Sequence, residues 1–161
     1  ELPSDVTAIE SVTVAAFLNA PHTSHTEQFI VNALRKAGML SVSLVAEDNG
    51  EIVGHVAISP ISISDGSSGW YILGPISVAP DRQGLGIGSQ LVKQALAELC
   101  KLSAAGCVLV GNPNYYGRFG FRPEPALVLP DISPEYFQAI LFGAEIPTGI
   151  VTCHEAFNAQ G

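Results

Sequence analysis

Glycines at positions 84, 86 and 88 mark the segment of this sequence with the clearest chemistry. They lie in residues 81–89 (DRQGLGIGS), between a predicted strand and a predicted amphipathic helix. The first turn of a helix has four N–H groups without partners inside the helix, and its dipole attracts negative charge. Glycines let the backbone approach an anion closely, and Arg82 adds a cation. The turn therefore predicts a pyrophosphate-binding site.

Two common nucleotide-binding turns do not fit this segment. A phosphate-binding loop of the Walker A type needs a lysine after its glycines, and none follows here. A dinucleotide fingerprint counted from Gly84 needs a third glycine at position 89, which is Ser89. It also needs a carboxylate at the end of the next strand, and that strand ends at Val110-Gly111-Asn112. Coenzyme A is the third ligand that such a turn can hold.

The histidines and cysteines form no metal or nucleophilic constellation. His22 and His25 are spaced like ligands on one helical turn, but no cysteine or carboxylate cluster joins them. Cys153 and His154 are neighbours on a predicted strand, so their side chains point to opposite faces. We therefore expect no metal site and no catalytic dyad. An odd number of cysteines predicts reduced thiols and a cytoplasmic location. The three cysteines are Cys100, Cys107 and Cys153.

The segments that must position the glycine turn alternate between helical and strand periodicity, which predicts a mixed α/β domain. An antiparallel meander of three strands comes before the turn, with Asp48-Asn49-Gly50 as a hairpin signal. The expected strands are 42–47, 51–60, 70–78, 107–110 and 149–153. The expected helices begin at Ser4-Asp5 and after Ser24, and continue with 86–102, 114–118 and 134–142.

Composition limits the class of protein. The chain has 161 residues, of which 47% are hydrophobic, and we expect one domain over 1–161. Its net charge of −8 argues against nucleic-acid binding by phosphate neutralisation and favours a cationic or neutral second substrate. No apolar run reaches the length of about 18 residues that a membrane span needs, and no leader opens the chain. We therefore expect neither a nucleic acid nor a membrane as partner.

Three blocks of sequence together resemble the GNAT family of N-acetyltransferases. Residues 83–88 (QGLGIG) match its pattern Q/R-x-x-G-x-G/A, and residues 76–80 (ISVAP) match the preceding strand. Residues 108–112 (VLVGN) are followed by 116–121 (YGRFGF), which resembles the family's strand, Asn loop and Tyr-x-x-x-Gly-Phe. The order and spacing agree over residues 42–122. More narrowly, the chain resembles the YhbS-like branch of that family.

The resemblance implies a fold and a reaction. The fold is a mixed, mostly antiparallel central sheet of six to seven strands flanked by about four helices, with residues 122–161 shaping the acceptor pocket. The family's first edge strand must be absent or very short here, because little precedes Ser4. The reaction is direct attack of a primary amine on acetyl-CoA, which is a cosubstrate, in a ternary complex without metal.

The resemblance also implies the roles of individual residues. Tyr116 takes the place of the general acid that protonates the departing thiolate, while the neighbouring Tyr115 packs or lines the pocket. A backbone N–H between Ile76 and Val78 polarises the carbonyl group. Cosubstrate binding is assigned to Ile76, Ser77, Val78, Arg82, Gln83, Gly84, Leu85, Gly86, Ile87, Gly88, Ser89, Asn112, Asn114 and Tyr116.

Several alternatives remain open from the sequence. His55 is a candidate base because imidazole titrates near neutrality, but it also reads as a hydrogen-bonded, partly buried histidine. Glu47, Asp65 or a chain of water molecules could serve instead. Asn112 and Asn114 equally suit loop capping beside a proline. A non-catalytic acyl-CoA sensor or a longer acyl donor fits the same fold. The chain is expected to be a monomer or a homodimer.

Overall fold

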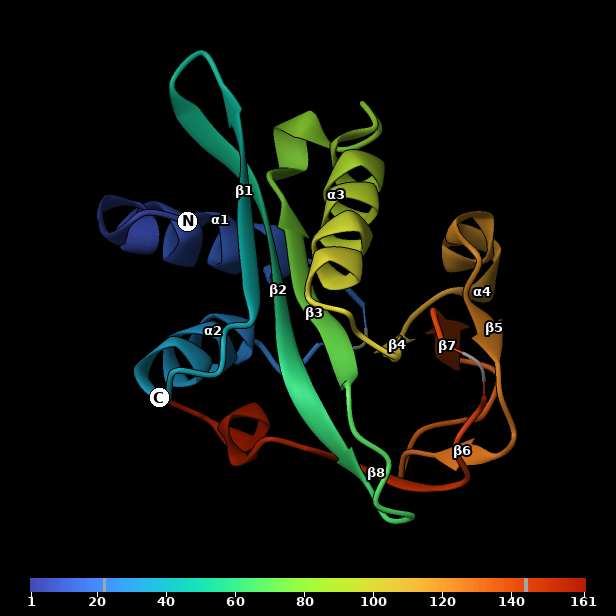
Figure 1. Ribbon diagram of the computed structural model, residues 1–161. Helices are drawn as coiled ribbons and strands as arrows, with labels where there is room; N and C mark the ends of the chain where they lie inside the picture. Colours follow the sequence, from blue (N-terminus) through green and yellow to red (C-terminus); the bar gives the residue numbers. More distant parts are fainter. Residues whose placement is uncertain (22, 144) are drawn as a thin grey trace.

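A mixed sheet of eight strands runs through the computed structural model, which describes residues 1–21, 23–143 and 145–161 (Figure 1). The strand order is β5-β7-β4-β3-β2-β8-β6, and β1 pairs with β2 outside this path. Two pairs, β3 with β4 and β6 with β8, are parallel, and the other pairs are antiparallel. The strands are β1 Val42–Asp48, β2 Glu51–Ile63, β3 Trp70–Val78, β4 Gly106–Val110, β5 Arg122–Pro123, β6 Leu127–Val128, β7 Phe137–Leu141 and β8 Gly149–Cys153.

Helices cover both faces of this sheet (Figure 1). The first two lie on one face, where Ile9 and Val12 are buried as α1 packs on β2 and β3. The third lies on the other face, so close to β2 that a Cβ on Gly54 would be 3.1 Å from the Leu91 side chain. The helices are α1 Val6–Phe17, α2 Glu27–Lys36, α3 Ile87–Lys101 and α4 Pro113–Tyr116. Short 3-10 turns lie at Pro3–Asp5, Pro80–Arg82, Gly117–Phe119 and Glu155–Asn158.

The expected meander of β1, β2 and β3 is confirmed, and its first turn follows from the sequence. Asn49 and Gly50 both have positive φ, 51° and 78°, as the tight hairpin turn requires. Along β2, successive side chains point to opposite faces of the sheet. Val56 and Ile58 join the core beneath α3 together with Leu91 and Leu99.

The prediction of a helix at 134–142 is wrong, because residues Phe137–Leu141 form strand β7 between β4 and β5. The local chain does begin as a turn, in which the N–H of Phe137 donates to the carbonyl of Pro134 at 3.3 Å. Phe137, Gln138 and Ala139 are all buried, so burial does not alternate along the first part of β7. A strand of this kind cannot be distinguished from a buried helix by periodicity alone.

The mixed, mostly antiparallel sheet is confirmed, with eight strands in the described chain, two of them only two residues long. No strand precedes α1 within the described residues, and the amino group of Glu1 donates to the carbonyl of Ser43 on β1 at 2.7 Å. None of the described helices has the length and hydropathy of a membrane span.

Candidate active site

Strands β3 and β4 separate in the middle of the sheet. They pair only over Trp70–Ile72 and Gly106–Val108. Beyond Ile72, β3 contains an irregularity at Gly74-Pro75, where the bond is cis and the register with β2 shifts. From there β3 continues beside β2 alone, while β4 continues beside β7. The result is a gap between two neighbouring strands of one sheet.

Backbone N–H groups of β3 point into this gap. The N–H of Ala79 donates to the carbonyl of Val53 on β2 at 2.8 Å. Because backbone groups alternate along a strand, Ser77 also faces β2, and Ile76 and Val78 direct theirs away from it. The carbonyl of Val78 accepts a hydrogen bond of 3.1 Å from Gln83 Nε2. The N–H groups of Ile76 and Val78 are thus the donors available to a group bound in the gap.

The glycine turn leads into α3 as the sequence predicted. Gly84 and Gly86 have φ values of 79° and 84°, which strongly favour glycine, and Gly86 is the residue just before the helix. The first turn of α3, whose N–H groups have no partners inside the helix, borders the gap at Ile87, Gly88 and Ser89. Arg82 lies beside them, but its guanidinium already pairs with Asp48 at 3.2 Å and with Asp81 at 3.0 Å.

An aromatic and cationic wall stands opposite this turn. The Arg118 guanidinium lies 4.6 Å from the centre of the Tyr115 ring, and its Nη2 donates to Ser89 Oγ at 3.4 Å. The Tyr115 hydroxyl is 3.5 Å from the same Ser89 oxygen. Arg118 thus brings a cation to the first turn of α3 without an acidic partner among the described residues. Such a cation can pair with phosphate.

Tyr116 lies deeper, against the backbone of Gly111, directly after β4. Its ring makes a T-shaped contact with that of Tyr115, with centroids 4.8 Å apart, and another with Phe121 at 6.2 Å. Burial, and to a lesser degree Tyr115, raises the pKa of Tyr116 to about 12. The phenol therefore keeps its proton at neutral pH and can act as a proton donor.

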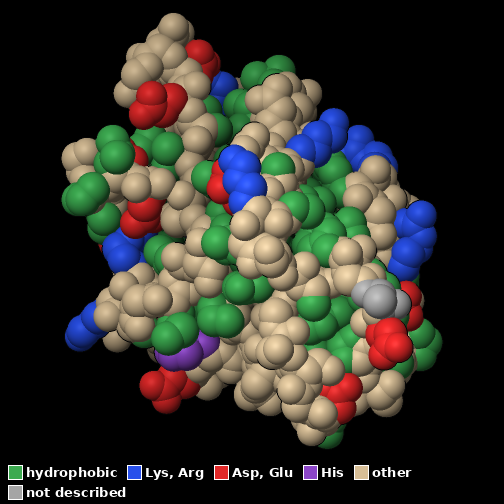
Figure 2. Space-filling model, viewed as in Figure 1, with side chains coloured by type: hydrophobic (Ala, Val, Ile, Leu, Met, Phe, Trp, Pro, Cys, Tyr) green, Lys and Arg blue, Asp and Glu red, His purple; other side chains and the backbone are tan. Residues whose placement is uncertain are grey.

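A cavity of about 520 Å³ joins these parts. Ten of the residues that the sequence assigned to cosubstrate binding line the cavity. Four more residues, from α1, α4 and the turn after α4, also line it. The ten are Ile76, Val78, Arg82, Gln83, Gly84, Gly86, Ile87, Gly88, Ser89 and Tyr116, and the others are Tyr115, Ala16, Phe17 and Arg118. On the face in Figure 2, Lys and Arg side chains gather along the upper right edge, over α3 and α4, with hydrophobic side chains between them.

Four residues assigned to cosubstrate binding do not line this cavity. Ser77 is 2% exposed, and its hydroxyl is buried without a hydrogen-bond partner among the described residues. Leu85 projects into solvent on the other side of the turn, with 67% exposure. Asn112 Oδ1 accepts a hydrogen bond of 2.8 Å from the N–H of Asn114, so this pair caps α4.

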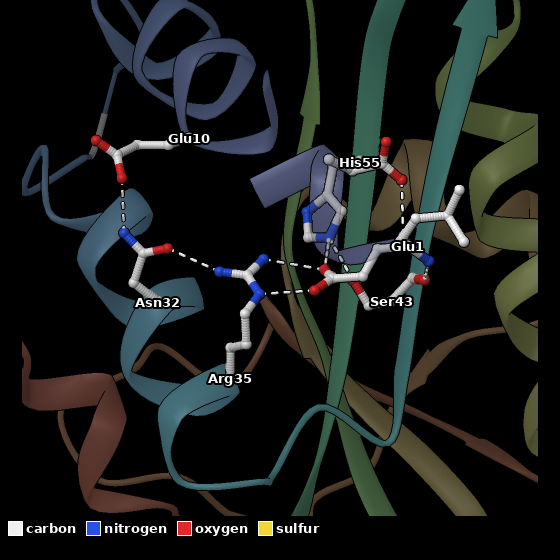
Figure 3. A network of polar contacts seen from close by, with 8 residues as sticks. Glu1, Glu10, Asn32, Arg35, Ser43 and His55 are labelled. Atoms are coloured by element: carbon white, nitrogen blue, oxygen red, sulfur yellow. Dashed lines mark hydrogen bonds and ion pairs between the residues drawn. The ribbon is translucent and has the colours of Figure 1, made fainter. Parts of the chain in front are cut away.

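His55 also lies apart from the cavity, in a polar network on the α1 and α2 side of the sheet (Figure 3). Its Nε2 is 2.8 Å from Ser43 Oγ and 3.8 Å from a carboxylate oxygen of Glu1. Arg35 donates to both oxygens of the same carboxylate, at 2.6 and 2.9 Å. Burial lowers the pKa of His55 to about 4 against the opposing charge of Glu1, so the imidazole is neutral at pH 7.

Two cavity residues, Ala16 and Phe17, carried no signal in the sequence, because they are apolar residues at the end of a helix some 60 positions before the glycine turn. Arg118 carried a weak signal, because it follows Tyr115 by three residues and so shares its side of a helical turn. Within the described chain, no group of three or more His, Cys, Asp or Glu residues is placed to hold a metal ion. His22 lies outside the described residues.

Comparison with known proteins decides what this arrangement is. The model of the acetyltransferase (GNAT) domain matches residues 40–123. The N-acetyltransferase YhbS of Escherichia coli K12 is 30% identical over 172 aligned positions, which cover 98% of this chain and 96% of that protein. The chain belongs to the GNAT family of acetyltransferases.

Two solved GNAT structures extend this result to the cosubstrate. A GNAT acetyltransferase from Brucella melitensis in complex with acetyl-CoA is 45% identical, with a TM-score of 0.87, covering 98% of this chain and 94% of that one. Escherichia coli YhbS in complex with CoA is 31% identical, with a TM-score of 0.89, covering 100% of this chain and 91% of that one. The GNAT fold, the resemblance to YhbS and the acetyl-CoA-dependent N-acetyltransferase class expected from the sequence are confirmed.

Proposed function

We propose that this chain transfers the acetyl group of acetyl-CoA to a primary amine by direct attack in a ternary complex, with Tyr116 as the general acid. The observation that carries the proposal is the cavity that contains the first turn of α3, the free strand amides and Tyr116 together. The first turn of α3 and Arg118 suit the diphosphate, and the gap beside β3 suits an extended pantetheine arm in the place of a strand.

Polarisation of the carbonyl and protonation of the leaving thiolate each have a donor in the cavity. The N–H groups of Ile76 and Val78 polarise the thioester carbonyl, and one such donor is worth about 3 kcal/mol in related acyl transfers. The amine nitrogen forms a bond to the carbonyl carbon, and the carbon–sulfur bond breaks. The Tyr116 hydroxyl gives its proton to the departing thiolate, and a thiol leaves.

For the base, we propose water rather than a side chain. His55 does not line the cavity, and its Nδ1 is buried without a partner among the described residues. Asp65 lies in the turn after β2, where it accepts a hydrogen bond from the N–H of Ser67 at 2.9 Å. Glu47 lines a separate groove beside β1. The amine proton therefore passes to solvent.

The setting of the reaction is part of the same proposal. The three cysteines are free thiols, which suits a reducing compartment such as the cytoplasm. The net charge of −8 favours a cationic or neutral acceptor. Residues 1–161 are proposed to act as one domain, as a monomer or a homodimer. None of the described residues of 122–161 lines the cavity, and the proposal that this segment shapes the acceptor side beyond it rests on the family resemblance.

Two measurements test the proposal. Acetyl-CoA should raise the melting temperature, and thiol release should follow with at least one member of a panel of primary amines. Stabilisation without thiol release from any amine would favour a non-catalytic acyl-CoA sensor. Absence of stabilisation would refute both. Competition between acetyl-CoA and longer acyl-CoA thioesters tests the acyl group, and acetyl-CoA should bind at least as tightly as the longer ones.

A further inference from the structure

The ring of Tyr116 rests on a residue that has no side chain. Gly111 lies between the end of β4 and the start of α4. A Cβ on Gly111 would be only 2.4 Å from Tyr116 Cε2 and 2.8 Å from Cδ2. The position of the ring therefore depends directly on the position of the Gly111 backbone.

Two hydrogen bonds from the far side hold that backbone. The N–H of Gly111 donates to the carbonyl of Tyr136 at 2.9 Å. The carbonyl of Gly111 accepts from Gln138 Nε2 at 3.0 Å. Gln138 belongs to β7, opposite Leu109 of β4, and is only 1% exposed. One residue of the backbone is thus fixed by a neighbouring carbonyl and by a buried side-chain amide.

Packing alone does not explain an amide at position 138. Ile140 and Leu109, which lie on the same face of the sheet, belong to an apolar core. Gln138 Oε1 is buried without a hydrogen-bond partner among the described residues. A buried, unpaired polar atom is unfavourable, and a leucine would avoid it. The remaining use of this side chain is the hydrogen bond that its Nε2 donates to Gly111.

We propose that Gln138 is a positioning residue for the general acid. Through Gly111 it sets the depth at which the Tyr116 ring lies and so brings the hydroxyl within reach of the thiolate. The inference rests on the role proposed above for Tyr116. A shift of about 1 Å in a reacting group can cost roughly 100-fold in rate, which makes such support measurable.

A double-mutant cycle tests the inference. Gln138→Leu removes the donor and keeps a similar volume. It should lower kcat about 10-fold while KM for acetyl-CoA changes less than about twofold, because the diphosphate site is untouched. Tyr116→Phe should lower kcat about 100-fold or more. In the Tyr116→Phe background, Gln138→Leu should change kcat by less than about twofold, because its effect passes through the lost hydroxyl.

Leu34→Ala is the control, since Leu34 is fully buried (0% exposed) on α2 in a separate small core with Ile30 and Ala156 and does not line the cavity. It should lower the melting temperature at least as much as Gln138→Leu, with kcat unchanged at a temperature where both variants are folded. Equal losses of kcat from Gln138→Leu in both backgrounds would overturn the positioning role alone. A Tyr116→Phe enzyme within twofold of the wild-type kcat would overturn the acid role, and the inference with it.

Discussion

The surroundings of Tyr116 keep its phenol protonated. A phenol in water has a pKa near 10, and burial raises that of Tyr116 to about 12. The neutral form is therefore favoured at every pH well below 12. The same shift makes the phenol a weaker acid, so transfer of its proton to a free thiolate, whose thiol has a pKa of about 8.5, is uphill by about 5 kcal/mol. The breakdown of the acyl adduct, in which the carbon–sulfur bond breaks, must offset this cost.

We predict that kcat shows no descending limb from Tyr116 below pH 10. Because the pKa is raised, loss of the phenolic proton begins only as pH approaches 12. The measurement is kcat at saturating acetyl-CoA and amine from pH 7 to 10. A descending limb between pH 8 and 9 that disappears in Tyr116→Phe would contradict the buried, protonated phenol.

His55 does not line the cavity, but its burial makes the free energy of unfolding depend on pH. Its pKa is about 4 in the folded protein, and an unfolded histidine has a pKa near 6.5. As pH falls below 6.5, the unfolded chain binds the proton first. This part of the stability is therefore present above pH 6.5 and is lost by about pH 4. The difference corresponds to about 3 kcal/mol at most.

We expect His55→Gln to reduce the loss of unfolding free energy between pH 7 and pH 4.5, measured by urea unfolding. The Arg35 guanidinium holds the pKa of Glu1 near 2, so the contribution of Glu1 is lost only below pH 4.5 and falls outside this window. His25→Gln, on an exposed histidine, is the control. An equal loss in wild type and His55→Gln would show that His55 is not the group responsible.

At the scale of elements, conformations set by neighbouring residues could be predicted from the sequence. Those set by contacts between distant residues could not. Asn49-Gly50 and the glycines of the α3 turn need positive φ, so their conformations follow from residue type. Strand β7 and the approach of Phe17 to the cavity depend on partners far along the chain. Phe137 and Ile140 pack into different cores, which no window of neighbouring residues reveals.

The turn before α3 gives a prediction with a matched pair of glycines. Gly86 and Gly66 have the same φ of 84°, and a Cβ on either residue would have no atom within 4 Å among the described residues. Gly86→Ala and Gly66→Ala should each cost about 1–2 kcal/mol of stability. Only Gly86→Ala should weaken acetyl-CoA binding, by about tenfold in calorimetry, because only that residue borders the anion site. Equal affinities in the two variants would argue against binding at this turn.

At the scale of the whole molecule, one sheet is held together by a short pairing. Three residues of β3 and three of β4 join the meander to β4, β7 and β5, whereas β8 and β6 are joined to it through β2. Bound pantetheine along β3 would supply partners that β4 does not.

Amide exchange measured by NMR should reveal this. In the free protein, Ser77 and Ala79 are bonded to β2 and should exchange slowly, while Ile76 and Val78 should exchange faster. Saturating acetyl-CoA should slow Ile76 and Val78 about tenfold or more and leave Ser77 and Ala79 little changed. Equal protection of all four amides in the free protein would mean that the gap is closed in solution.

The gap between β3 and β4 also bears on solubility. Another chain can add a strand to a strand edge with unpaired amides, and such pairing leads to aggregation. Here that edge lies inside the sheet, with Phe17 on one side and the aromatic side chains of α4 on the other. A second polypeptide would have to displace these flanks before it could pair. The unpaired amides of β3 can therefore bind the narrow cosubstrate, while strand addition by another copy of the protein is hindered.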